Sequence, residues 1–211
     1  MKSQDILILL KLICIQLLER DTAKRQLSYI GAEDDWKGWT TEGEIKQLNL
    51  PPINEQEDPY SLRNIQNVTG VSKTEISASI NRSIGSGLAI RDRKTNKPKA
   101  NTQALLEFLI YGVKYVFPVK PGEIVRGIPT SFSAPVMSEK LMTAGEIICV
   151  WPDAYGNKKG QAIVPLFKSV PKAVKIDPYL YELLALVDAL RLGNARESVL
   201  AKEMLKERLG G

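Results

Sequence analysis

The stretch that decides the fold reads Gly70-Val71-Ser72-Lys73-Thr74-Glu75-Ile76. Ser72 and Glu75 have the spacing of a capping box, in which each side chain accepts a hydrogen bond from the backbone N–H of the other residue. Val71 and Ile76 flank the box at the positions of a hydrophobic staple. Gly70 is suited to the left-handed conformation that ends a helix. The stretch therefore predicts the end of one helix, a tight turn and the start of a second helix.

Apolar spacing on both sides of this turn predicts a helix-turn-helix. Before Gly70, helical spacing relates Leu62, Ile65 and Val68. After it, every fourth residue is isoleucine, at Ile76, Ile80 and Ile84. Two short helices joined by a glycine turn make this motif. Residues 88–90 (Leu-Ala-Ile) read as a strand and residues 91–99 as a basic turn, which together predict a wing.

These residues carry a family resemblance. Residues 70–76, with Ile80-Asn81-Arg82 and Gly87-Leu88, resemble the winged helix-turn-helix of MarR-like bacterial transcriptional regulators. The resemblance implies sequence-specific binding of double-stranded DNA, with repression as the default mode. The winged-helix antitoxins of abortive-infection systems carry a similar head joined to a second domain. They imply an alternative function, an antitoxin that regulates its own operon and binds a toxin.

The periodicity of the second helix selects candidate DNA-binding side chains. With the isoleucines facing inward, a turn of 100° per residue directs Asn81 and Arg82 outward. Asn to adenine and Arg to guanine are bidentate base contacts, and Lys73 near the helix start suits a phosphate. The predicted DNA-binding residues are Ser72, Lys73, Thr74, Ser77, Ala78, Asn81, Arg82, Arg91, Arg93, Lys94, Lys97 and Lys99. The alternative interpretation is a solvated helix face beside an ordinary soluble hairpin.

Charge is distributed unevenly along the chain. The 211 residues carry a formal net charge of +5, which permits nucleic-acid binding without requiring it. Residues 60–120 contain ten Lys or Arg against three Asp or Glu, whereas residues 28–59 contain two against eight. The excess of positive charge thus coincides with the predicted head.

Several classes of active or metal site are not expected. The chain has no histidine, which excludes Ser-His-Asp catalysis and His-ligated metals, and its two cysteines, Cys14 and Cys149, lie in apolar runs as expected for buried thiols. Asp153 resembles the first acid of a Mg²⁺-dependent nuclease, but Gln161 and Ile163 stand where that motif needs an acid and a lysine. The segment from Arg126 to Ser133 fits either an anion pocket or a structural connection. We therefore expect no enzyme, no cofactor and no metal.

The ends of the chain predict a homodimer. Ser3 to Ala23 reads as a helix that is apolar on nearly every side and so must be buried on two faces. Asp177 to Gly193 and Asn194 to Leu209 read as an amphipathic helical hairpin. One winged-helix core cannot cover all these apolar faces, so a dimer interface built from the terminal helices is expected. The alternative is that the C-terminal helices pack on the Ser3–Ala23 helix within a single chain. The acidic insertion at 24–59, with Trp36 and Trp39, is either a solvated loop or a surface for a protein partner.

The remaining signals predict an α+β protein with two units. Residues 1–112 form the winged helix-turn-helix, closed by a helix from Thr102 to Tyr111 with Asn101 as its cap. Residues 113–211 form a regulatory or dimerisation unit with a small sheet and the helical hairpin. Its expected strands are Val113–Phe117, Ile147–Trp151 and Gln161–Phe167, with a hairpin turn at 155–160. No membrane span or signal peptide is recognisable, so a cytoplasmic protein is expected.

Overall fold

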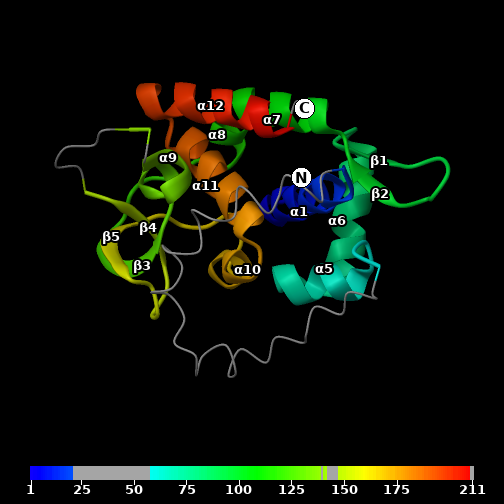
Figure 1. Cartoon of the computed structure of the whole chain (residues 1–211), viewed down its shortest axis with the longest axis horizontal. Helices are drawn as coiled ribbons and strands as arrows, with labels where there is room; N and C mark the ends of the chain where they lie inside the picture. Colours follow the sequence, from blue (N-terminus) through cyan, green and yellow to red (C-terminus); the bar gives the residue numbers. More distant parts are fainter. Residues whose placement is uncertain (21–57, 139, 142–146, 210–211) are drawn as a thin grey trace.

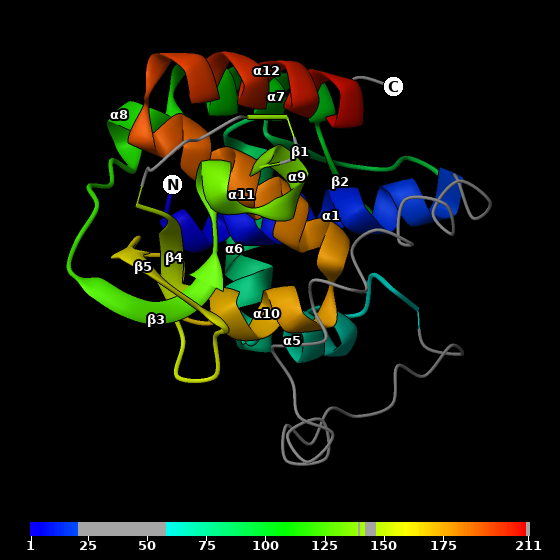
Figure 2. The same cartoon turned by 60° about the vertical axis from the view of Figure 1, so that its left-hand side comes forward.

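The computed structural model describes residues 1–20, 58–138, 140–141 and 147–209. The described elements form a mixed α+β protein in three tiers of helices with a small barrel at one end (Figures 1 and 2). The predicted insertion at 24–59 lies outside the described residues up to residue 57. Among the described helices, none has the length and apolar character needed to cross a membrane.

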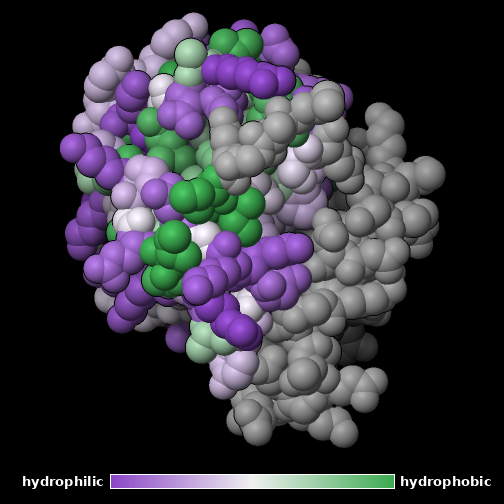
Figure 3. Space-filling view, turned by 90° about the vertical axis from the view of Figure 1, so that its left-hand side faces the viewer, coloured by the Kyte–Doolittle hydropathy of each residue, from purple (hydrophilic) through white to green (hydrophobic). Residues whose placement is uncertain are grey.

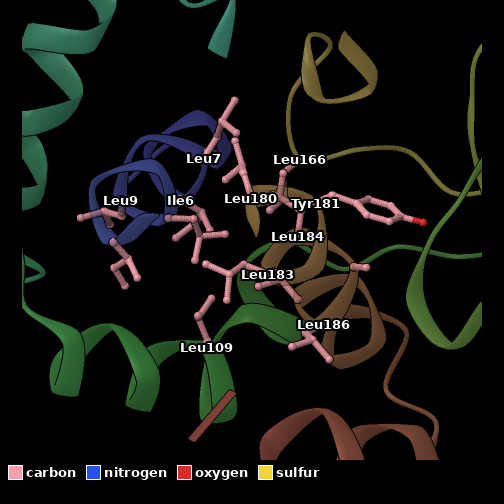
Figure 4. Packing of buried hydrophobic residues seen from close by; sticks show 14 of the residues in the cluster. Ile6, Leu7, Leu9, Leu109, Leu166, Leu180, Tyr181, Leu183, Leu184 and Leu186 are labelled. Carbon is pink, nitrogen blue, oxygen red and sulfur yellow. The ribbon is translucent and has the colours of Figure 1, made fainter. Parts of the chain in front are cut away.

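The middle tier holds two helices that are buried on all sides. They are α1 (Ser3–Arg20) and α11 (Pro178–Leu192). From Ile6 to Ile15, every apolar side chain of α1 is at most 2% exposed. Figure 4 shows Ile6 and Leu7 of α1 facing Leu180 and Leu183 of α11, with Leu109 nearby. The apolar faces that suggested a dimer are thus covered within one chain, and the argument for a dimer interface through the terminal helices fails.

The outer tiers pair elements from distant parts of the sequence. In Figures 1 and 2, α7 (Thr102–Tyr111) and α12 (Ala195–Leu209) lie side by side above the middle tier. Below it lie α5 (Leu62–Thr69) and α10 (Val170–Ile176). One hydrophobic core runs through all three tiers, so the boundary predicted at residue 112 passes through shared packing.

The helix caps read from the sequence are present. Gly70 and Gly193 end α5 and α11 in the left-handed conformation, at φ 68° and 74°. Asn101 accepts from the backbone N–H of Ala104 at the start of α7, and Asp177 accepts from that of Leu180 at the start of α11. These local signals located the helices because each satisfies backbone groups that the helix itself leaves unpaired.

The three strands β3 (Ile124–Pro129), β4 (Cys149–Pro152) and β5 (Lys158–Ala162) close into a small barrel. β3 runs antiparallel to both neighbours, and β4 and β5 run parallel. Glycines allow this tight closure: a Cβ on Gly127 would lie 2.0 Å from the carbonyl oxygen of Trp151. A Cβ on Gly156 would lie 2.2 Å from the carbonyl oxygen of Gly127, so the connection between β4 and β5 passes directly over β3.

The barrel corrects several predictions for the second half. The turn at 155–160 is not a hairpin, because it crosses β3 and joins parallel strands. β5 begins at Lys158 rather than 161. β3 overlaps the segment 126–133, whose glycine and proline predict an anion pocket or a structural connection rather than a strand. The strand predicted at Val113–Phe117 is instead a short helix, α8 (Val113–Val116), in which Val113 is buried. Tertiary packing outweighs the strand preference of its valines. Two further short elements, η1 (Ser131–Ser133) and α9 (Pro135–Ser138), follow β3.

A buried carboxylate ties the barrel to α11. Asp188, 1% exposed, accepts from the indole Nε1 of Trp151 at 2.6 Å and from the hydroxyl of Thr130 at 3.0 Å. Burial raises the pKa of Asp188, and the Arg191 guanidinium at 2.5 Å opposes that rise. Arg191 also donates to the carbonyl of Phe117, so one side-chain pair joins α11, β4 and the end of α8.

Candidate nucleic-acid interface

The candidate interface is built on α6 (Lys73–Gly85) and the hairpin of β1 (Ala89–Arg91) and β2 (Pro98–Ala100). The Ser72 hydroxyl accepts from the backbone N–H of Glu75 at 3.4 Å, which is one half of the predicted capping box. The Glu75 carboxylate instead faces α1, where it accepts from Gln4 Nε2 and lies 3.6 Å from Lys2 Nζ. The helix start is therefore capped as predicted, but its acid belongs to the contact with α1.

The buried face of α6 is rotated from the predicted one. Its buried side chains are Ile76, Ser79, Ile80 and Ser83, whereas Ile84 is only partly buried. Ser79 and Ser83 are small buried residues of α6, and this helix packs against α1. This rotation leaves Lys73, Thr74, Ser77 and Asn81 exposed and Ala78 partly so. The exposed face thus agrees with most of the predicted set on this helix.

Arg82 departs from the prediction that it points outward. Its Nε donates to Asp5 Oδ2 at 3.1 Å and its Nη2 to Asp5 Oδ1 at 2.6 Å, a bidentate pair across to α1. Asp5 is 1% exposed and also accepts from the backbone N–H of Lys2. Burial pushes the pKa of Asp5 upward, but the hydrogen bonds from Arg82 and Lys2 outweigh burial and leave it lowered. Arg82 therefore fixes α6 to α1 and is not available as a free base-reading side chain.

The sequence did contain a signal for this pair. Asp5 interrupts a helix that is otherwise apolar on nearly every side, and a carboxylate buried in such a helix requires a cationic partner. Lys11 follows the same rule, since its Nζ lies 2.8 Å from the Asp177 carboxylate in the core. Spacing along the chain could not identify either partner, because Asp5 and Arg82 are 77 residues apart.

The hairpin between β1 and β2 has a structured tip. Asp92 Oδ1 accepts from the backbone N–H groups of Lys94 and Thr95, and Asn96 adopts the left-handed conformation at φ 56°. The hydrogen bond from Lys99, 2.9 Å away, and those from the two backbone N–H groups lower the pKa of Asp92. The hairpin therefore presents a fixed turn.

The five predicted wing cations divide into two groups. Lys97 and Lys99 are partly buried, and each forms a salt bridge. Lys97 Nζ lies 3.0 Å from the Asp58 carboxylate, and Lys99 Nζ lies 2.9 Å from the Asp92 carboxylate. Lys97 also lies over the ring of Tyr60, 4.9 Å from its centroid. Arg91, Arg93 and Lys94 are exposed and form no ion pair with any described residue. The free positive charge of the hairpin is thus confined to β1 and the tip (Figure 1).

The alternatives considered for the second half have a structural explanation. Asp153 accepts from the backbone N–H of Tyr155 and pairs with Lys175 at 3.0 Å, as expected for a turn residue. Cys14 and Cys149 are buried and form no disulfide. In the part of the chain that the structure describes, no group of three or more acidic, cysteine or histidine residues is placed to hold a metal ion.

Comparisons with known proteins supply no further evidence. No protein-family model matches the chain, and neither the curated proteins nor the solved structures contain a match.

Proposed function

We propose that the chain binds double-stranded DNA in a sequence-specific manner and regulates transcription, as a repressor that blocks polymerase by occupying an operator. In this proposal α6 enters the major groove and the β1–β2 hairpin contacts the adjacent backbone as a wing. Each protein chain supplies one such head, and the proposal requires no dimer.

The observation that carries this proposal is the exposed polar face of α6. Lys73, Thr74, Ser77 and Asn81 lie free on one side of a helix whose other side is held by α1. An Asn side chain can make two hydrogen bonds to adenine, and the hydroxyls can bond to base edges or phosphates. A rigidly backed helix with this composition is suited to reading a groove.

The free cations of the hairpin support the same function. Arg91, Arg93 and Lys94 have no described carboxylate to neutralise them, so they can release counterions from a phosphate backbone. Lys97 and Lys99 take a different role, because their contacts with Asp58, Tyr60 and Asp92 brace the hairpin.

Selection of bound duplexes from a random-sequence pool, followed by affinity measurements, tests the proposal. We expect an enriched motif. Asn81→Ala should cost about 1–3 kcal/mol at one base position and little elsewhere. Gln103→Ala, an exposed amide on α7, is the matched control and should bind like the unaltered chain.

The wing has its own measurement. Arg93→Gln together with Lys94→Gln should weaken binding to all duplexes and lower the slope of log affinity against log salt by about 2. The proposal is overturned if no motif is enriched and if Asn81→Ala and the wing variant both bind duplexes as tightly as the control.

A further inference from the structure

A second group of free cations lies on the barrel, at the end of the molecule opposite the hairpin (Figure 1). Arg126 on β3 is the direct cross-strand partner of Lys159 on β5, and Lys158 lies beside them opposite Gly127. All three residues are exposed, and the side chain of none of them forms an ion pair or hydrogen bond with a described residue. Like charges placed directly opposite each other destabilise a strand pair, so this arrangement costs stability.

Among the described residues, the acids nearest in sequence are Glu123 and Asp153, and neither forms an ion pair with these cations. The Asp153 carboxylate in the adjoining turn is held at 3.0 Å by Lys175, which also lies 5.6 Å from the centre of the Tyr155 ring. Lys168 and Lys172, next to and within α10, add two exposed cations without a described partner. Figure 3 shows hydrophilic side chains gathered beside hydrophobic ones on this side of the molecule. The barrel face thus has a surplus of unneutralised positive charge.

The strands that carry these cations are closely packed at two glycines. Gly127 and Gly160 have no room for a Cβ, since it would lie 2.0 Å from the oxygen of Trp151 in one case and 2.3 Å from that of Ile148 in the other. The strands that carry Arg126 and Lys159 are therefore each packed closely against the segment 148–151. A ligand that binds these cations does not have to order a loose loop, which lowers the entropic cost of binding.

We infer that the cations at this end of the barrel, Arg126 and Lys159 on one face of the β3–β5 pair and Lys158 beside them at the start of β5, bind the phosphate backbone of duplex DNA. Arg and Lys side chains on a strand supply charge neutralisation toward phosphates, which carries no direct sequence information. Contact at this face is therefore independent of sequence. Because the barrel and the hairpin lie at opposite ends of the long axis, one chain can hold two duplex segments. This bridging rests on the proposed function of α6, whereas the contact at the barrel does not.

A bridging assay tests the inference with the full chain. One 30-base-pair duplex is fixed on beads, protein is added at low salt, and capture of a second, fluorescent duplex is measured. The barrel variant is Arg126→Gln, Lys158→Gln and Lys159→Gln. The control variant, Arg196→Gln, Lys202→Gln and Lys206→Gln, removes the same charge from α12 on the upper tier. Thermal melts of both variants establish that they fold.

We expect the unaltered chain and the control variant to capture the second duplex. The barrel variant should stay on the beads while its capture falls to the level seen without protein. Capture by the barrel variant equal to that of the control would overturn the inference.

A third variant separates this inference from the proposed function. It carries Asn81→Ala, Arg93→Gln and Lys94→Gln. If this head variant binds the beads normally while the barrel variant no longer binds, the barrel is a DNA surface and the proposed role of α6 is wrong. If only the head variant fails to bind the duplex on the beads, and the barrel variant captures the second duplex normally, the proposed role of α6 is supported and the barrel inference is wrong.

Discussion

The pair between Asp5 and Arg82 should make a large contribution to the stability of the proposed head. It has two hydrogen bonds, at 2.6 and 3.1 Å, and the carboxylate is 1% exposed. Loss of one partner from a fully buried ion pair costs about 3–5 kcal/mol. The Arg82 side chain is 30% exposed and can be partly rehydrated, so we expect Asp5→Asn to cost less, about 2 kcal/mol.

A double-mutant cycle measures the interaction itself. Asp5→Asn, Arg82→Gln and the double variant are unfolded with urea, and the coupling free energy is taken from the four values. We expect a coupling of about 1.5–3 kcal/mol, the range for hydrogen bonds to charged groups. A coupling below about 0.5 kcal/mol, within the usual error of additivity, would refute the assignment of Arg82 to α1.

The pH dependence of the unfolding free energy tests the same ion pair, Asp5 with Arg82, in a second way. Because the pKa of Asp5 is lowered in the folded state, its charged form stabilises the fold above the ordinary value of 3.8. That contribution should disappear as the pH falls from about 3.8 through the lowered pKa of the folded state. Asp5→Asn should therefore lose less stability than the unaltered chain over this range. Equal losses in the two proteins would mean that Asp5 is not held in its charged form by the fold.

Three substitutions test other parts of the fold by thermal melts and urea unfolding. Gly127→Ala places a Cβ 2.0 Å from the Trp151 carbonyl oxygen and should cost more than about 3 kcal/mol, whereas Gly122→Ala makes only ordinary contact at 3.4 Å and is the control. Gly85→Ala meets nothing within 4 Å near the end of α6 and should stabilise by about 0.5–1 kcal/mol; a destabilised variant would contradict the described helix end. Ser72→Ala removes the cap of α6 and should cost about 0.5–1 kcal/mol, and an unchanged melting temperature would argue against that cap.

Short-range signals were sufficient to predict the helices of the head and the hairpin. The caps at Ser72, Asn101 and Asp177 act within three residues, so the sequence contains both partners of each hydrogen bond close together. The same holds for Gly70 and Gly193, whose left-handed conformation ends a helix at the residue itself.

Long-range contacts explain what the sequence did not reveal. The stripe of Ile76, Ile80 and Ile84 predicts that Arg82 points outward, but it leaves out the serines that are buried on the same helix. The dimer was expected because the apolar faces of α1 and α11 were counted separately, whereas each covers the other. The barrel was missed because its closure depends on Gly127 and Gly156 meeting across strands, which no local pattern indicates.

The burial of α1 between both halves has a consequence for how the chain is made. Synthesis produces α1 before any of the elements that cover it, and its partner α11 comes more than 150 residues later. α5, α6 and β2, which also pack on α1, are made by residue 100, but until α11 appears the face of α1 that packs on it has no native partner, and such exposed apolar surface is prone to aggregation. Native packing of α1 must therefore be completed late, and contacts this distant in sequence are expected to slow folding. A cell that produces this protein has to keep this face of α1 from aggregating until α11 has left the ribosome.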